Sequence, residues 1–196
     1  YKAIDYFEQA CKRDPNYAAA YAGISDCYQL LGNWGLLQPE IAAQKGMEYA
    51  TKALDLNDSL SEAHTSMAVA LSNQEWDWEG AEREYKRAIA LNPSYSTAHH
   101  WYAIHLLVPQ RRWNEAIKEM NEAEKLDPYF SIIAANTGVT LFYAGRHQEG
   151  INQLRHVLEM DPGSAYAHYM LGTFLVAASF IEEGATEIER ALAIRP

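Results

Sequence analysis

Apolar and small residues recur at spacings of three and four along most of the chain. In six segments a small residue is followed four positions later by an apolar residue, and three positions after that by Ala or Val. Such spacing places the three residues on one side of an α-helix. The six sets are Ala3, Phe7 and Ala10; Gly46, Ala50 and Ala53; Ala81, Tyr85 and Ala88; Ala116, Met120 and Ala123; Gly150, Leu154 and Val157; Gly184, Ile188 and Ala191. The pattern predicts six helices of one design.

A helix-breaking pair follows each of these segments. The pairs are Asp14-Pro15, Asn57-Asp58, Asn92-Pro93, Asp127-Pro128, Asp161-Pro162 and Arg195-Pro196. Proline lacks an N–H and excludes its predecessor from the helical conformation, so a helix ends there. From Asp58 to Pro196 the second members of the pairs follow one another at a nearly constant interval, with the first two intervals one position longer than the last two. A fixed period of this length is typical of a solenoid repeat.

After each internal break a second apolar stripe predicts another helix. Its members are Tyr21, Ile24 and Tyr28; His64, Met67 and Leu71; His99, Tyr102 and Leu106; Ala134, Thr137 and Leu141; His168, Leu171 and Leu175. Small residues recur within the stripe at Ser25, Ala68, Ala103, Gly138 and Gly172, where two helix backbones are expected to approach closely. We therefore expect an all-α chain of about 11 helices.

This arrangement resembles the tetratricopeptide repeat, a helix–turn–helix unit of about 34 residues. The best matches run from Tyr143 through Pro162 and from Leu171-Gly172 through Pro196, and the resemblance covers essentially the whole chain. It implies a right-handed α-solenoid, a superhelix of stacked antiparallel helix pairs whose first helices line the concave face. The array is expected to hold a half repeat (1–17), a repeat with an insertion (18–60) and four further repeats (61–95, 96–130, 131–164 and 165–196).

The insertion in the repeat at 18–60 follows Gly32. Pro39 suits the first position of a helix, which is expected to run to about Leu56, some two turns longer than its counterparts. Trp34, Leu36 and Leu37 would lie near its projecting end. Two interpretations remain open for these three residues: an exposed apolar docking knob, or side chains that fold back over the neighbouring helix pair.

The formal net charge of −10 bears on the class of partner. Nucleic-acid binding needs a basic face, so we expect this segment to bind no nucleic acid. We also expect no membrane partner, because an acidic body repels anionic surfaces and no transmembrane run is present. Cys11 and Cys27 make no disulfide framework and are interpreted as buried free thiols. The compartment stays open, with the cytoplasm favoured, and the abrupt ends suggest a segment of a longer protein.

No HExxH, CxxC, GxSxG, GxGxxG or Walker motif is present. His64, His99 and His168 occupy equivalent places in three repeats. Equivalent residues on neighbouring helices lie at least about 8–10 Å apart, whereas zinc needs nitrogens within about 2 Å of one centre. Packing explains these histidines better than a metal, and the acidic residues of the second helices are interpreted as a solvated face. We expect no enzyme activity, no metal site and no cofactor.

A separate stripe on each first helix is free to face a ligand, because successive helical residues are about 100° apart. It consists of Asp26, Gln29, Thr65, Val69, Ser72, His100, Ile104, Ala135, Asn136, Val139, Phe142, Tyr169 and Thr173. It holds no Lys or Arg, so the grip on a C-terminal carboxylate that some family members use is not expected. The stripe turns from polar to apolar and aromatic along the chain, which suits a peptide with apolar anchors. The alternative is that these side chains only complete the packing between repeats.

We interpret the chain as a protein-interaction scaffold that binds a partner peptide or domain on the concave face. WDWEGAEREYKRAIALNPSYSTAHHWYA and NTGVTLFYAGRHQEGINQLRHVLEMDP resemble the tetratricopeptide segments of bacterial signalling proteins, which implies a place in a larger bacterial regulatory protein. Two alternatives remain: a sensor domain that binds a small or lipid-like ligand in an apolar groove, and a module that self-associates through its ends.

Overall fold

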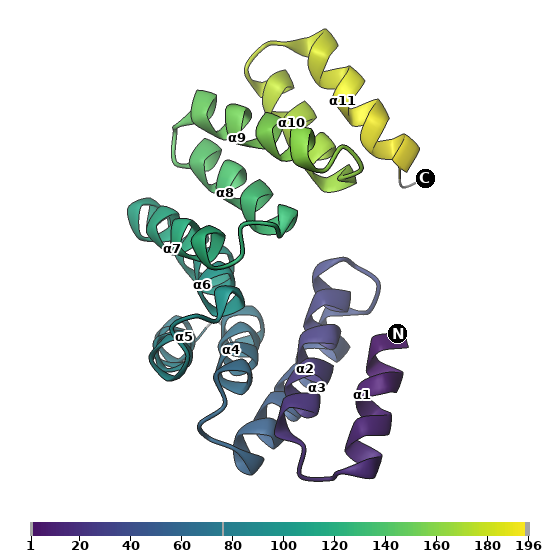
Figure 1. Cartoon of the computed structure of the whole chain (residues 1–196), viewed down its shortest axis with the longest axis vertical. Coiled ribbons are helices and arrows are strands. Elements are labelled where there is room, and N and C mark those ends of the chain that lie inside the picture. The colour runs from purple at the N-terminus through teal and green to yellow at the C-terminus, as the bar shows by residue number, and fades with distance from the viewer. Residues whose placement is uncertain (1, 76, 195–196) are drawn as a thin grey trace. The chain divides into compact units, whose positions relative to one another are not determined.

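The computed structural model describes residues 2–75 and 77–194, which form eleven α-helices and no strand (Figure 1). The helices are α1 (Lys2–Arg13), α2 (Ala18–Asn33), α3 (Pro39–Leu56), α4 (Ser61–Ala70), α5 (Trp78–Leu91), α6 (Ser96–Tyr102), α7 (Trp113–Leu126), α8 (Ser131–Tyr143), α9 (His147–Met160), α10 (Ala165–Ala177) and α11 (Ile181–Ile194). The predicted all-α fold of stacked helix pairs is confirmed. The break at Arg195-Pro196 lies outside the described residues. Within the described part, no helix is long and apolar enough to cross a membrane.

The chain divides into two compact units, unit 1 (residues 1–106) and unit 2 (residues 107–196). In unit 1, α2 packs against α3, α4 packs against α5, and the first helices α2 and α4 contact each other. One core cluster of this unit centres on Ile4, Ile24 and Leu31, against which the half-buried thiols Cys11 and Cys27 pack. The cysteines therefore belong to the packing of α1 on α2, as free thiols.

In unit 2, α8 packs against α9, α10 packs against α11, and α10 also contacts α8 and α9. The core lies between these helices and includes Leu154, Leu171, Phe174 and Leu175, all buried. Burial of side chains this large is the main source of stability for such an array.

The small residues predicted at close helix approaches perform that role in unit 2. A Cβ atom added to Gly150 would lie 2.6 Å from the carbonyl oxygen of Gly138, and one added to Gly184 would lie 2.7 Å from that of Gly172. The two helices of each pair therefore meet backbone to backbone at these glycines, as the pattern indicates.

Three turns of unit 2 share one geometry. The amide N–H groups of Arg112, Arg146 and Phe180 donate to the carbonyl oxygens of Leu107, Leu141 and Leu175, each at 2.9 Å. The residue just before the donor is left-handed in all three turns, with φ of 57° at Arg111, 84° at Gly145 and 71° at Ser179. Glycine adopts this conformation without strain, whereas arginine and serine do so at a cost.

Two π-helical segments, Leu71–Glu75 and Ala103–Leu107, follow α4 and α6. They occur in the two repeats, closed by Pro93 and Pro128, that are one position longer than the two after them. A π turn adds one residue to a helix while keeping its backbone hydrogen-bonded. The second segment leaves Leu106 and Leu107, which are adjacent in sequence, both fully buried. The extra residue of these repeats is therefore absorbed near the end of the first helix.

The helix after the insertion begins at Pro39 and ends at Leu56, as predicted, with proline in its first turn. The expectation that it is two turns longer than its counterparts is wrong. It has 18 residues, against 14 in α5, α7, α9 and α11, which is about one turn more. The insertion forms the connection before α3, which includes the exposed Gly35 with φ of 66°.

Candidate functional site

The predicted groove residues of unit 1 lie mostly inside the fold. Five are buried and two, Asp26 and Ile104, are half-buried; the buried ones are Gln29, Thr65, Val69, Ser72 and His100. The Gln29 side-chain NH2 group donates within the unit, to the Ser25 hydroxyl at 3.0 Å and to the Ser66 carbonyl at 2.9 Å. This part of the stripe presents little side-chain surface to a partner, and its use as a groove stays a prediction.

Asp26 is the ionisable group of this region. The Ser66 hydroxyl donates to Asp26 Oδ1 at 2.5 Å. Burial raises the pKa of Asp26 to about 7, the nearby Glu62 charge acts in the same direction, and the hydrogen bond from Ser66 opposes both. The carboxyl is thus held close to its point of ionisation at neutral pH.

Two histidines of unit 1 are kept neutral. Burial lowers the pKa of His100 to about 3, with the His105 charge acting in the same direction, and burial lowers the pKa of His105 to about 4. The His105 ring makes an edge contact with Trp101, with ring centres 5.8 Å apart. His100 and Trp101 are buried in unit 1, and His105 is half-buried beside them.

His64, His99 and His168 close the turn that precedes each first helix. Nε2 of each ring bonds the backbone carbonyl six residues earlier, in Asp58 at 2.7 Å, Pro93 at 3.2 Å and Pro162 at 3.0 Å. Among the described residues no group of three His, Cys, Asp or Glu side chains could hold a metal ion. Through its bond to the backbone carbonyl, the repeated histidine acts as a structural hydrogen-bonding residue.

Two of these histidines contact carboxylates of second helices, for which the sequence predicts a solvated face. For Glu84, one of the carboxylates interpreted in this way, that prediction is wrong. Glu84 Oε2 lies 2.5 Å from His64 Nδ1, and Glu187 Oε2 lies 2.6 Å from His168 Nδ1. The signal that could have found them is the nearly constant spacing between each histidine and a glutamate on the following helix, 20 positions in the first pair and 19 in the second.

The predicted residues of unit 2 lie on α8 and α10, which contact each other. Ala135 is buried, Tyr169 is exposed, and the other four are half-buried: Asn136, Val139, Phe142 and Thr173. The Phe142 ring stacks on Phe174, with ring centres 3.8 Å apart, so it belongs largely to the core of the unit.

α10 carries an exposed apolar stripe, formed by Tyr166, Tyr169 and Val176. Their exposed fractions are 37%, 51% and 38%, and their spacing of three and seven places them on one face of the helix. Tyr166 was missed in the sequence, although it stands one turn before Tyr169. Its hydroxyl donates to Asn136 Oδ1 at 2.7 Å, which brings this face of α10 beside Asn136 of α8. Burial and then the Tyr143 charge raise the pKa of Tyr166 to about 12, so the hydroxyl stays protonated.

The three residues of the proposed docking knob separate into two environments. Trp34 and Leu36 are 64% and 59% exposed. Leu37 is half-buried and packs against the cluster of Ile4, Ile24 and Leu31. The tip is thus available to a partner while Leu37 anchors it, and docking at this tip stays a prediction.

The chain matches a family model described as tetratricopeptide repeat over residues 76–129 and 136–196, more than half of its length. It belongs to the tetratricopeptide repeat family. A comparison with curated proteins found no match.

Several solved structures share the fold of this array. One is YrrB, described as a TPR protein with an unusual peptide-binding site: 20% identity, TM-score 0.58, 97% of this chain and 92% of that one covered. Another is PilF of Pseudomonas aeruginosa, with 20% identity, a TM-score of 0.68, and 88% and 77% of the two chains covered. A third is IFIT1 with the capped RNA m7Gppp-AAAA, with 16% identity, a TM-score of 0.82, and 100% and 46% covered. At these identities the likeness concerns the fold alone.

Proposed function

We propose that this tetratricopeptide array is a non-catalytic scaffold that binds a partner peptide or domain, with apolar side chains of the partner seated on the first-helix face of unit 2. The array has the architecture for this role, because each repeat supplies one rigid first helix and neighbouring first helices present a continuous surface. The proposal locates the main contact around Tyr169, beside Asn136 and Thr173.

The observation that carries the proposal is the exposed stripe of Tyr166, Tyr169 and Val176 on α10. A tyrosine left half-exposed on a rigid helix combines a large apolar area with a polar tip, and tyrosine is enriched among residues that dominate binding energy. Asn136 lies beside the stripe, where its side-chain oxygen accepts from the Tyr166 hydroxyl and so holds the stripe against α8. An apolar side chain of a partner would pack against the two tyrosine rings and Val176 here.

The neighbours in fold support the class of partner without fixing it. YrrB is described as having a peptide-binding site, whereas IFIT1 was solved with a capped RNA. The net charge of −10 favours a peptide over a nucleic acid for this chain. The resemblance of its repeats to those of bacterial signalling proteins supports a place in a larger bacterial regulatory protein, where the array would recruit or assemble a partner.

Selection of random peptides displayed on phage against the purified chain tests this function. A selected peptide is then titrated against wild type, Tyr169→Glu and Tyr129→Glu. Tyr129 is the matched control, because it is 94% exposed and lies in the turn before α8 rather than on α10. We expect Tyr169→Glu to raise the Kd at least about tenfold, since it places a charge where an apolar group docks, and Tyr129→Glu to leave it unchanged. Equal affinity of all three chains would remove the α10 stripe as the binding site.

A further inference from the structure

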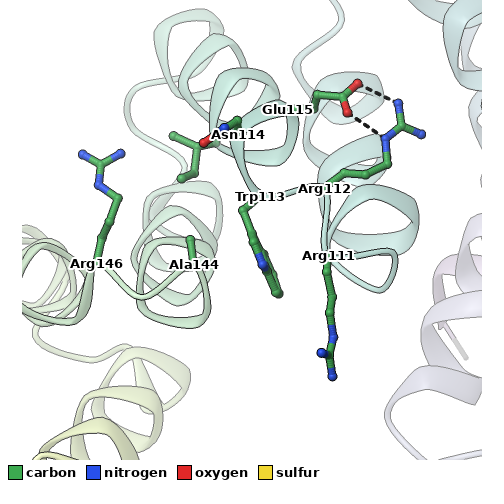
Figure 2. A pocket seen from close by; sticks show the side chains of 8 residues that line it. Arg111, Arg112, Trp113, Asn114, Glu115, Ala144 and Arg146 are labelled. Carbon is green, nitrogen blue, oxygen red and sulfur yellow. Dashed lines mark hydrogen bonds and ion pairs between the residues drawn. The ribbon is translucent and has the colours of Figure 1, made fainter.

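A cavity in unit 2 gathers three arginines of an otherwise acidic chain (Figure 2). It has a volume of about 320 Å³ and lies between the segment 111–117, where α7 begins, and the turn at 144–146 that precedes α9. Arg111, Arg112 and Arg146 all contribute to its lining. The cavity is formed by the turns between helices rather than by the first-helix stripe.

Two of the three guanidinium groups already have a carboxylate partner. Arg112 Nε and Nη2 lie 2.8 and 2.6 Å from the two carboxylate oxygens of Glu115. Arg146 Nε and Nη2 lie 2.7 and 2.5 Å from those of Glu149. Both pairs join the N-cap residue of a helix to the residue three positions later, so the two turns repeat one arrangement.

Arg111 is the guanidinium without such a partner among the described residues. Figure 2 shows its side chain extending beside the Trp113 ring and away from the Arg112–Glu115 pair. The three arginines and their two glutamates leave one positive charge in excess. An arginine fork left unpaired beside a cavity offers two parallel N–H groups, the arrangement that matches a carboxylate.

The helix ends add to this positive field. α7 and α9 both begin at this cavity, and neither N-cap arginine forms a side-chain capping bond. In α5, by contrast, Asp77 accepts from the Gly80 amide. Helix N-termini favour negative charge within the first turn. The partial positive charges at the N-termini of α7 and α9 add to the full positive charge of the Arg111 guanidinium.

Apolar groups complete the cavity. Trp113, Ile117 and Ala144 also line it, so a bound group would place methylene carbons against them and its charged end near Arg111. A phosphate, which carries a charge of about −1.5 to −2 and no methylene groups, would exceed the single positive charge available. A carboxylate on a short aliphatic chain matches both the charge and the apolar lining.

We propose that this cavity binds a glutamate side chain of an acidic partner peptide, with Arg111 as the residue that pairs with its carboxylate. The site is separate from the stripe around Tyr169 and does not require it. A scaffold that holds both would prefer partners that carry an acidic residue in addition to apolar anchors.

The test uses acetyl-Glu-Glu-Glu-amide as the probe and the neutral acetyl-Gln-Gln-Gln-amide as its counterpart. Binding is followed by the chemical shift of the Trp113 indole N–H, which reports from within the cavity. Arg111→Gly is the informative variant, because glycine relieves the left-handed conformation at φ of 57° while it removes the charge. Ser179→Gly is the matched control: the same turn position in a later repeat, with φ of 71°, and outside the cavity.

We expect the glutamate peptide to shift the Trp113 signal with saturation and the glutamine peptide to leave it in place. Arg111→Gly is expected to raise the Kd at least about tenfold, the loss of one charge-assisted pair, in a chain at least as heat-stable as wild type. Ser179→Gly is expected to bind as wild type does. An equal response to both peptides, or an unchanged Kd in Arg111→Gly, would overturn the proposal. Tighter binding of inorganic phosphate than of the glutamate peptide would overturn the carboxylate assignment.

Discussion

His168 and Glu187 form a nearly buried contact between the two helices of the last pair, with Nδ1 and Oε2 2.6 Å apart. The other ring nitrogen bonds the Pro162 carbonyl at 3.0 Å, and the second oxygen of Glu187 accepts from Arg190 at 2.6 Å. The imidazole thus joins the turn before α10 to the middle of α11. The His168 side chain on α10 therefore bonds both the turn before α10 and the following helix α11.

Glu187→Ala is expected to lower the free energy of unfolding by about 1–3 kcal/mol, because it leaves a nearly buried ring nitrogen without its partner. Urea unfolding measures the change. Glu189→Ala is the control, since Glu189 is exposed on the same helix. Equal unfolding midpoints for the two variants would show that the contact with His168 contributes nothing to stability.

Asp26 is expected to make stability fall as the pH rises from about 4 to about 7. Its pKa is raised to about 7 in the folded chain, against about 3.9 when unfolded. Between these values the folded state binds more protons, so its stability from this group is fully present below the unfolded pKa and is lost as the pH passes the folded pKa. A shift of about three pKa units corresponds to about 4 kcal/mol, at about 1.36 kcal/mol per unit. The loss of stability is smaller than this value, because Asp26 is partly accessible to water.

Asp26→Asn isolates this titration, since asparagine keeps an oxygen that can accept from Ser66. We expect it to be clearly more stable than wild type at pH 8 and to lose that advantage by pH 5, in urea unfolding at several pH values. Taking the difference between the two chains removes the opposite contribution of His100 and His105. Their lowered pKa values make stability fall as the pH drops below about 6.5. A difference that stays constant with pH would contradict the raised pKa of Asp26.

Gly150→Ala is expected to destabilise unit 2 by about 1–3 kcal/mol, although alanine is the better helix former. Its Cβ would lie 2.6 Å from the Gly138 carbonyl oxygen and 2.9 Å from the Phe142 nitrogen, and both are backbone atoms that yield only if the helices separate. Gly163→Ala is the comparison, because its Cβ would meet only Asp161 Oδ1 at 3.7 Å. Thermal unfolding followed by circular dichroism distinguishes the two. A wild-type melting temperature for Gly150→Ala would show that α8 and α9 are not closely packed there.

The fold was readable from the sequence because the physics that sets it is local and repeated. Pro39 opens a helix and Asn57 ends one whatever surrounds them, and the paired glycines mark close backbone contacts without reference to other repeats. The extra position in two repeats was also visible. The π-helical form that this extra position takes at Leu71–Glu75 and Ala103–Leu107 was not predicted from the sequence. The form depends on which side chains must stay buried once a helix has one more residue.

The sites were harder to predict because they depend on which residues face one another between helices. Thr65 and Val69 satisfy the helical spacing of a ligand-facing stripe, yet both are buried in a unit where α4 contacts α2 and α6. The carboxylate of Glu84 was predicted to be solvated because its partner, His64, lies on another helix. The arginine cavity needs the turns before α7 and α9 to lie together, which spacing within one helix does not express.

Photo-cross-linking of a selected peptide tests the central claim, that a partner lies on the first helices, most directly. Benzoylphenylalanine replaces Tyr169 on α10 in one chain and, in another, Leu192 on α11, which is 61% exposed on a second helix. We expect a cross-link from position 169 that unlabelled peptide suppresses, and no such cross-link from position 192. Cross-linking from position 192 alone, or equally from both positions, would contradict it.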